Sequence, residues 1–256
     1  MQDIAETQGS TGTKEMSLFS RLANVFAAPG EVFDNIKSSP PRTVNWLIPT
    51  ILLLVTGSVF IVTMFSNPAV KSQLIAQAEK RIDQMVERGT IPAQSRDQVV
   101  DQQVKALDSP ISTVFGIVGY AFVVFAMLFG LSLVWWLIGR WVFKSQIKYG
   151  KVVEVVGLAS TVSFLGGIVM VLLLTAFGSL YATPSLALAV IDSFDPKNTV
   201  HSLLASVNLF TLWYLGVTSV GLGKVYTVPT GKIAIWVFGL WAIYSIGSAT
   251  ISLPFF

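Results

Sequence analysis

The placement of charge constrains this chain more than any other feature. Five long stretches contain no Asp, Glu, Lys or Arg: residues 43–70, 109–139, 155–191, 198–223 and 233–256. A bilayer core about 30 Å thick needs about 20 apolar residues of helix to cross it, and each stretch is long enough. A charged side chain at the centre of a span costs about 2.5–3.5 kcal/mol. The pattern therefore predicts an all-α integral membrane protein, a helical bundle of about five transmembrane helices.

The composition agrees with a lipid environment. Of the 256 residues, 53% are hydrophobic and 12% are charged, whereas a soluble domain carries about 25% charged residues. The net charge is only +3 and the basic residues are scattered, which argues against nucleic-acid binding. The absence of Cys excludes disulfides, thiolate metal sites and a Cys nucleophile.

The chain divides into three expected regions. Residues 1–15 are predicted to be a disordered polar tail, 16–43 cytoplasmic amphipathic entry helices, and 44–253 the membrane domain. Within that domain we expect spans at about 44–65, 111–138, 153–177, 202–222 and 233–253. An extramembrane helical hairpin is predicted at 66–110, between the first two spans, because Gly89 breaks one helical pattern and Pro92 opens the next. The polar start of the chain lacks an apolar core, so the first span is expected to act as an uncleaved insertion signal.

Apolar residues recur at helical spacing in the entry region, which is interrupted by Pro29 and ends at Pro40-Pro41. An amphipathic helix of this kind either lies in the headgroup plane or packs beneath its own bundle. The residues expected to contact lipid or a partner are Leu18, Phe19, Leu22, Phe26 and Phe33. The simpler interpretation, a juxtamembrane helix docked on its own protein, is favoured.

Basic residues in the short loops predict the orientation. With the N-terminus in the cytoplasm, the inner side includes the acid-free loop that carries Arg140, Lys144, Lys148 and Lys151, whereas the loop before the fourth span carries Lys197. This bias favours a cytoplasmic N-terminus and an outer C-terminus. We expect the cytoplasmic (inner) membrane of a bacterium, with the endoplasmic reticulum or Golgi membrane as the alternative.

Few ionisable residues fall near the spans. Glu154 lies at the inner mouth of the third span and is expected to be interfacial, within reach of water or headgroups, with Lys151 as a candidate partner. His201, at the outer mouth of the fourth span, is expected to be structural. Because intramembrane ionisable residues usually mark an ion or substrate path, their scarcity predicts an interior without charge for chemistry.

Small residues spaced by four recur in the spans, and this spacing lets helix backbones approach closely. The expected helix-packing residues include Ala159, Ser163 and Gly167, together with the aromatic Trp213 in the middle of the fourth span. Asn208 is a candidate hydrogen-bond partner for the indole of Trp213. A tight bundle within one chain explains the pattern, and so does self-association or an interface with another membrane protein.

No enzyme motif is complete. Gly221-Leu222-Gly223-Lys224 superficially resembles a phosphate-binding loop, but Thr218 stands where the first Gly is required. Val225 stands where Ser or Thr would bind magnesium. The sequence therefore predicts a protein that is not an enzyme, with no catalytic residue, cofactor or metal.

The order of several segments resembles the Ypt-interacting-protein (Yip) family of multispan membrane proteins. The segments that carry the resemblance are RLANVFAAPGEVFDNI (21–36), Pro40-Pro41, the hairpin, VVEVVGLAS (152–160), and VNLFTLWY (207–214) with GLG (221–223). The resemblance covers about residues 18–253 and implies a five-span helical fold with a cytosolic N-terminus. In eukaryotic relatives it implies vesicle trafficking, so a prenylated small GTPase is an expected partner only for a eukaryotic-like protein.

Two hypotheses for the function stay open. The first is a non-enzymatic membrane scaffold, or an assembly or trafficking partner, that binds other membrane proteins, itself or lipid. The second is a transporter or the membrane subunit of a transport complex. The scarcity of polar midplane groups and of internal repeats favours the first. A polar cavity lined by Ser163, Asn208 or Thr211 would favour the second.

Overall fold

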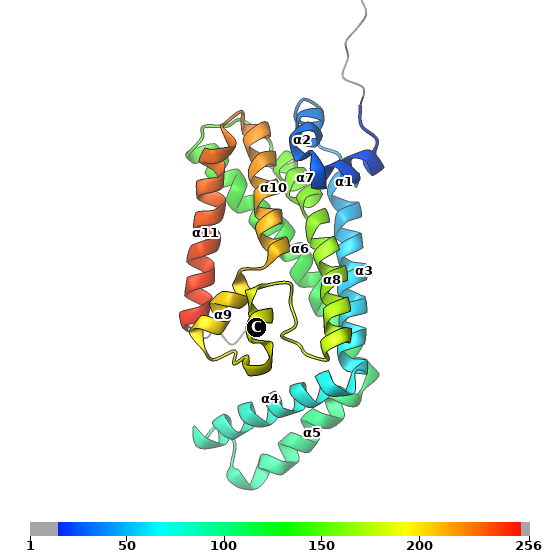
Figure 1. The fold of residues 1–256 in the computed structure, drawn as a ribbon, viewed down its shortest axis with the longest axis vertical. Coiled ribbons are helices and arrows are strands. Elements are labelled where there is room, and N and C mark those ends of the chain that lie inside the picture. The colour runs from blue at the N-terminus through cyan, green and yellow to red at the C-terminus, as the bar shows by residue number, and fades with distance from the viewer. Residues whose placement is uncertain (1–14, 252–256) are drawn as a thin grey trace, which may run out of the picture.

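Helices form the secondary structure of residues 15–251, which the computed structural model describes (Figure 1). The predicted all-helical class is confirmed. Within the described residues, four helices are long and apolar enough to cross a membrane: Val44–Ser66, Pro110–Trp141, Tyr149–Phe177 and Thr230–Thr250. They correspond to the first, second, third and fifth expected spans. The predicted tail 1–15, apart from Glu15, and the last two residues of the predicted final span lie outside the described residues.

The four long apolar helices and one shorter helix lie side by side (Figure 1). The long helices are α3 (Val44–Ser66), α6 (Pro110–Trp141), the consecutive α7 (Tyr149–Ala159) and α8 (Thr161–Phe177), and α11 (Thr230–Ile251). The shorter helix is α10 (Leu209–Tyr226). Ser160, between α7 and α8, keeps a helical backbone, and its hydroxyl donates to the Gly157 carbonyl at 2.6 Å. The two helices therefore continue one another as a single long span.

The fourth apolar stretch does not form the continuous helix expected at 202–222. The chain forms α9 (Thr199–Ser206), breaks at Val207 and Asn208, and then continues as α10. The Asn208 side chain accepts hydrogen bonds from the backbone N–H groups of Phe210 (2.9 Å) and Thr211 (3.3 Å). Such an N-cap starts a new helix, which explains why the expected span is divided.

The loop before α9 supplies partners for the broken backbone. Leu186 donates to the Val207 carbonyl at 3.2 Å, and Leu209 donates to the Pro184 carbonyl at 3.0 Å. The loop also contains η2 (Leu186–Ser193). Irregular backbone inside a membrane protein is tolerated where other parts of the protein satisfy its hydrogen bonds. These partners lie far away in the sequence, so the composition of the stretch could not indicate the break.

The helical hairpin predicted between the first two spans is present, and it consists of α4 (Pro68–Glu87), η1 (Ala93–Ser95) and α5 (Arg96–Asp108). Gly89 follows the first arm with a φ of +70°, which glycine adopts without strain. The arms are joined by Arg96 Nε and Asp83 Oδ1, 2.6 Å apart. Gln73 donates to the Gly178 carbonyl at 2.8 Å, so the hairpin lies where α8 ends (Figure 1).

The helices α1 (Leu18–Ala27) and α2 (Pro29–Lys37) lie at the opposite end of the bundle from the hairpin (Figure 1). We call this the entry end. Ser17 caps α1 by accepting a hydrogen bond from the Ser20 N–H at 3.2 Å, and Pro29 begins α2, where its missing N–H is no loss. Every residue from 151 to 162 is buried, because α1, α3, α6 and α10 all pack against α7.

Candidate functional site: a buried polar cluster at the entry end

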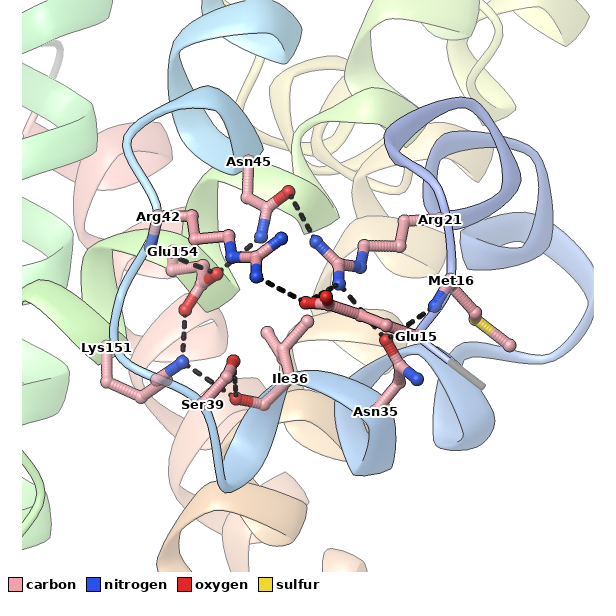
Figure 2. Close-up of polar contacts among 10 residues, drawn as sticks. All are labelled: Glu15, Met16, Arg21, Asn35, Ile36, Ser39, Arg42, Asn45, Lys151 and Glu154. Carbon is pink, nitrogen blue, oxygen red and sulfur yellow. Dashed lines mark hydrogen bonds and ion pairs between the residues drawn. The ribbon is translucent and has the colours of Figure 1, made fainter. Parts of the chain in front are cut away.

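Arg21 lies at one side of a group of polar side chains at the entry end (Figure 2). It is 1% exposed, because the face of α1 that carries it packs against the bundle. Nη1 donates to Asn45 Oδ1 at 3.2 Å, and Nη2 donates to Asn35 Oδ1 at 3.1 Å and to Glu15 Oε1 at 3.3 Å. The planar fork of donors of a guanidinium suits such a site with several acceptors.

Glu154 is the buried acid of this group. Its Oε1 accepts hydrogen bonds from Asn45 Nδ2 at 2.5 Å and from the Arg42 backbone N–H at 3.4 Å. Its Oε2 lies 2.5 Å from Lys151 Nζ, which also donates to the Ile36 carbonyl at 2.8 Å. The pairing with Lys151 is therefore present. The expected reach of Glu154 to water or headgroups is wrong, since it is fully buried beneath neighbouring helices.

Asn45, in the first turn of α3, joins the two charged halves. Its side-chain oxygen accepts from Arg21 and its amide nitrogen donates to Glu154 (Figure 2). The helices α1, α2, α3 and α7 therefore meet through one connected set of side chains. We call this set the polar cluster, and its members are Glu15, Arg21, Asn35, Arg42, Asn45, Lys151 and Glu154.

The polar cluster has a buried part and an exposed rim. Arg21, Lys151 and Glu154 are at most 4% exposed, and removing one partner of a buried ion pair costs about 3–5 kcal/mol. At the rim, Arg42 Nη2 lies 2.5 Å from Glu15 Oε1, with side chains 47% and 52% exposed. Exposed pairs contribute only about 0–1 kcal/mol. The buried part therefore determines how firmly the entry helices are held.

A second contact ties α2 to the end of α10. Lys224 Nζ lies 2.5 Å from Asp34 Oδ2, and Lys37 Nζ lies 2.8 Å from Asp34 Oδ1. The hydrogen bond from Lys224, followed by the one from Lys37, holds the pKa of Asp34 below its usual value of 3.8. Nearby, Phe33 covers Gly221 so closely that an added Cβ would lie 2.8 Å from its ring.

Two adjoining cavities lie among α3, α6, α8 and α10. The smaller has a volume of about 220 Å³ and reaches Tyr214, and the larger has a volume of about 420 Å³ and reaches Asn208 and Thr211. Leu53 and Ser163 line both. The larger cavity thus has the three polar residues that would favour transport, although most of its lining surface is apolar.

The chemistry available to the polar cluster is that of holding helices together. Both oxygens of Glu154 are occupied by amide or ammonium donors, so its carboxylate is engaged in structure. Within residues 15–251, no three His, Cys, Asp or Glu side chains lie close enough to bind a metal ion.

A family model described as the Yip1 domain matches residues 23–251 of this chain. The chain belongs to the Yip1 domain family. The match includes five members of the polar cluster, from Asn35 to Glu154, whereas Glu15 and Arg21 precede it. No curated protein and no solved structure matches the chain. Membership of the Yip1 domain family, together with the apolar helices, supports an integral membrane protein.

In this Yip1 domain protein, the residues expected to contact lipid or a partner differ in exposure. Phe19 is 82% exposed. Those that are partly buried are Leu18, Leu22 and Phe26. The Phe26 ring meets Trp213 edge-on, with 5.7 Å between the ring centroids, and Phe33 is fully buried in the core. Of this set, Phe19 is the side chain that α1 presents at the surface.

The expected helix-packing residues lie in different environments. Ala159 is fully buried in α7, Ser163 lines both cavities, and Gly167 faces Thr56 of α3, whose Oγ1 would lie 3.0 Å from an added Cβ. Trp213 lies in the second turn of α10, where it contacts Phe26. Asn208 uses its side-chain oxygen to cap α10, so its expected role as the partner of the indole is not what the structure shows.

The burial of Arg21, Lys151 and Glu154 at the entry end of the Yip1 domain protein was not predicted. The sequence contained a signal that Arg21 is buried. Residues 18, 21 and 25 share one face of a helix, and that face is apolar at Leu18 and Val25. For Asn45 no local signal exists. Its partners, Arg21 and Glu154, come from segments 24 and 109 residues away.

Proposed function

We propose that this Yip1 domain protein is a non-enzymatic membrane scaffold or assembly partner that presents α1 and α2 to other membrane proteins. The polar cluster carries the proposal, because each of its buried charges bonds to another helix or to the segment that leads into one. Buried charges in membrane proteins often mark an ion or substrate path. Here they connect elements, and they hold the entry helices in a defined position relative to the spans.

The exposed face of α1 is the surface that a partner would meet. Phe19 is 82% exposed, and the neighbouring Ala23 and Ala27 are exposed as well. Burying one large apolar side chain contributes about 1.5–3 kcal/mol, or roughly tenfold or more in affinity. A small apolar patch on a firmly held helix is suited to contact a membrane protein or the headgroup layer.

A fifth crossing is part of this proposal. The end of α8 lies beside the hairpin, where Gly178 accepts from Gln73, whereas α10 ends at the entry end, where Lys224 contacts Asp34. The chain must therefore return along the bundle between these points. With 18 residues, α10 is about 27 Å long, which is close to the thickness of the hydrocarbon core, about 30 Å.

The orientation of the bundle in the membrane follows from its basic residues. The loop between α6 and α7 lies at the entry end (Figure 1). It carries Lys144 and Lys148, and Arg140 precedes it in the last turn of α6. Basic residues near span ends favour the cytoplasmic side, so the proposal places α1 and α2 in the cytoplasm and the polar cluster at the cytoplasmic ends of the spans. The hairpin is then on the outer side of the cytoplasmic membrane of a bacterium.

Replacing Phe19 by Asp tests the scaffold proposal. The tagged protein, expressed at its native level, would be purified in mild detergent, and the membrane proteins that accompany it would be quantified by mass spectrometry. We expect a stoichiometric partner with the wild type and at least a tenfold lower recovery with Phe19→Asp, because the charge occupies the apolar contact. The matched control is Met85→Asp, which places the same charge at a 40% exposed apolar residue of α4.

Two results would count against the scaffold. One is a wild-type protein without any stoichiometric partner. The other is equal recovery with Phe19→Asp and with Met85→Asp, provided that both variants elute from a sizing column as the wild type does.

A transporter, or the membrane subunit of one, is the second candidate. The larger cavity favours it, because Ser163, Asn208 and Thr211 line it beside a broken helix, a feature of many substrate sites in transporters. The chain has no Cys, so Thr211→Cys would carry the only thiol. Reaction of this thiol with a membrane-impermeant maleimide, at a rate near that of Lys197→Cys in the loop before α9, would favour transport. Protection of Thr211→Cys would favour the scaffold.

A further inference from the structure

The two cavities form an elongated slot along the bundle. Their lining extends on α3 from Thr50 to Ile61, and from Ser160, just before α8, to Met170 of α8. At a rise of 1.5 Å per residue, either distance is about 15–17 Å. This is close to half of a hydrocarbon core about 30 Å thick, which is the depth that the acyl chains of one leaflet occupy.

Hydrocarbon suits this slot better than water does. The apolar side chains that line it include Leu53, Phe60, Ile61, Met127, Leu131 and Met170. Engineered apolar cavities of about 150 Å³ stay dry and bind small hydrocarbons, and the larger of these two cavities alone has about 420 Å³. An empty space of this size would forfeit packing contacts over its whole lining.

Several polar groups along the slot are occupied by their own helices. Thr50 Oγ1 donates to the Trp46 carbonyl at 2.7 Å, and Thr56 Oγ1 lies 3.0 Å from the Leu53 carbonyl. The Asn208 side-chain oxygen caps α10. Since these groups already have partners, they do not require water or a polar ligand in the slot.

The slot reaches the face that α6 turns toward lipid. Val123 and Met127 line the smaller cavity and are 51% and 53% exposed. On the same helix Phe115 and Phe122 are 72% and 75% exposed, as expected for a surface in contact with acyl chains. The medium with direct access to this opening is therefore the interior of the surrounding bilayer.

We propose that the slot is a binding site for one acyl chain of a bilayer phospholipid. The chain enters past Val123 and Met127 and extends between α3 and α8 toward Asn208. Its contacts are apolar, so the site selects hydrocarbon and does not require a particular headgroup. This inference goes beyond the scaffold role, and its failure would leave that role intact.

A photoreactive phospholipid tests the inference. The probe is a phosphatidylcholine with a diazirine in one acyl chain, incorporated into proteoliposomes that contain the full chain. After irradiation, mass spectrometry locates the adducts. We expect adducts on interior residues of the slot, such as Met170 and Tyr214, in addition to adducts on the lipid-facing surface of α6.

A variant whose slot is filled by a larger side chain is compared with a control variant. Ser163→Leu inserts an apolar side chain at the residue that lines both cavities, and it should lower the interior adducts at least tenfold. Ala176→Leu makes a similar change at an exposed residue of the same helix and should leave the interior adducts unchanged. If Ser163→Leu does not fold, the positions of the adducts on the wild-type protein still test the inference. Adducts on the interior residues support it, and adducts restricted to the outer surface overturn it.

Two further results would also overturn it. Interior adducts that persist in a folded Ser163→Leu variant would show that the probe does not occupy the slot. Interior labelling by diazirine-bearing palmitate, but not by the phospholipid probe, would assign the slot to a free fatty acid from the aqueous phase.

Discussion

At the residue scale, Lys151 and Glu154 depend on each other for their burial. Glu154→Leu would leave the Lys151 ammonium buried without its carboxylate, and should lower the free energy of unfolding by about 3–5 kcal/mol. The double variant Lys151→Met, Glu154→Leu removes both charges and should recover most of this loss. Unfolding by denaturing detergent in mixed micelles measures both.

The control for this comparison is Lys37→Met. Lys37 forms an exposed pair with Asp34, so its replacement should change the free energy of unfolding by less than about 1 kcal/mol. If Glu154→Leu were as stable as the wild type, the buried pair would not contribute to holding α7 and α2 together.

The sequence contains part of the polar cluster but not its geometry. The spacing of Lys151 and Glu154 at i and i+3 predicts a contact on one helix face, and the structure has it. Burial of that pair depends on α1 and α2 covering the entry end, which is a tertiary contact without local pattern. The charged side chain of an amphipathic helix is usually solvated, but Arg21 is buried because Asn45, Asn35 and Glu15 accept its hydrogen bonds.

At the scale of elements, α2 and α10 are joined by the contact between Asp34 and Lys224. The lowered pKa of Asp34 means that the folded state binds the proton less tightly than the unfolded state. The stabilisation is therefore complete above pH 3.8 and is lost as the pH falls through the lowered pKa. We expect the free energy of unfolding to fall more steeply from about pH 5 to about pH 2.5 in the wild type than in Asp34→Asn.

Glu31→Gln, on the same helix, is the control for this pH dependence, because it removes a carboxylate outside the contact with Lys224. Its unfolding should follow the wild-type curve more closely than that of Asp34→Asn does. Identical pH dependence in the wild type and in Asp34→Asn would mean that the contact does not hold α2 on α10.

The elements that the sequence predicts well are those defined by local pattern. Uncharged stretches bounded by charge match four long apolar helices, and Gly89 with Pro92 separates the arms of the hairpin. The division of the fourth stretch at Asn208 was missed, because apolar composition continues through the break. Backbone groups at the break find partners in the Pro184 carbonyl, the Leu186 N–H and the Asn208 side chain.

At the scale of the whole molecule, the topology that we propose has the two ends of the bundle on opposite sides of the membrane. Since the chain has no Cys, Lys197→Cys and Gln146→Cys each introduce a single thiol. We expect an impermeant maleimide added to spheroplasts to label Lys197→Cys at once, and Gln146→Cys only after permeabilisation. The reverse pattern would invert the orientation, and labelling of both in sealed spheroplasts would remove a crossing.

The central role that we assign to the polar cluster is to fix α1 relative to the spans. Spin labels at Ala23→Cys on α1 and Gln146→Cys in the loop between α6 and α7, both exposed, report this distance by pulsed electron resonance in nanodiscs. We predict one narrow distance distribution, and a clearly broader one when Asn45→Leu disconnects Arg21 from Glu154. A broad distribution with the cluster intact, or an unchanged one after Asn45→Leu, would contradict the claim.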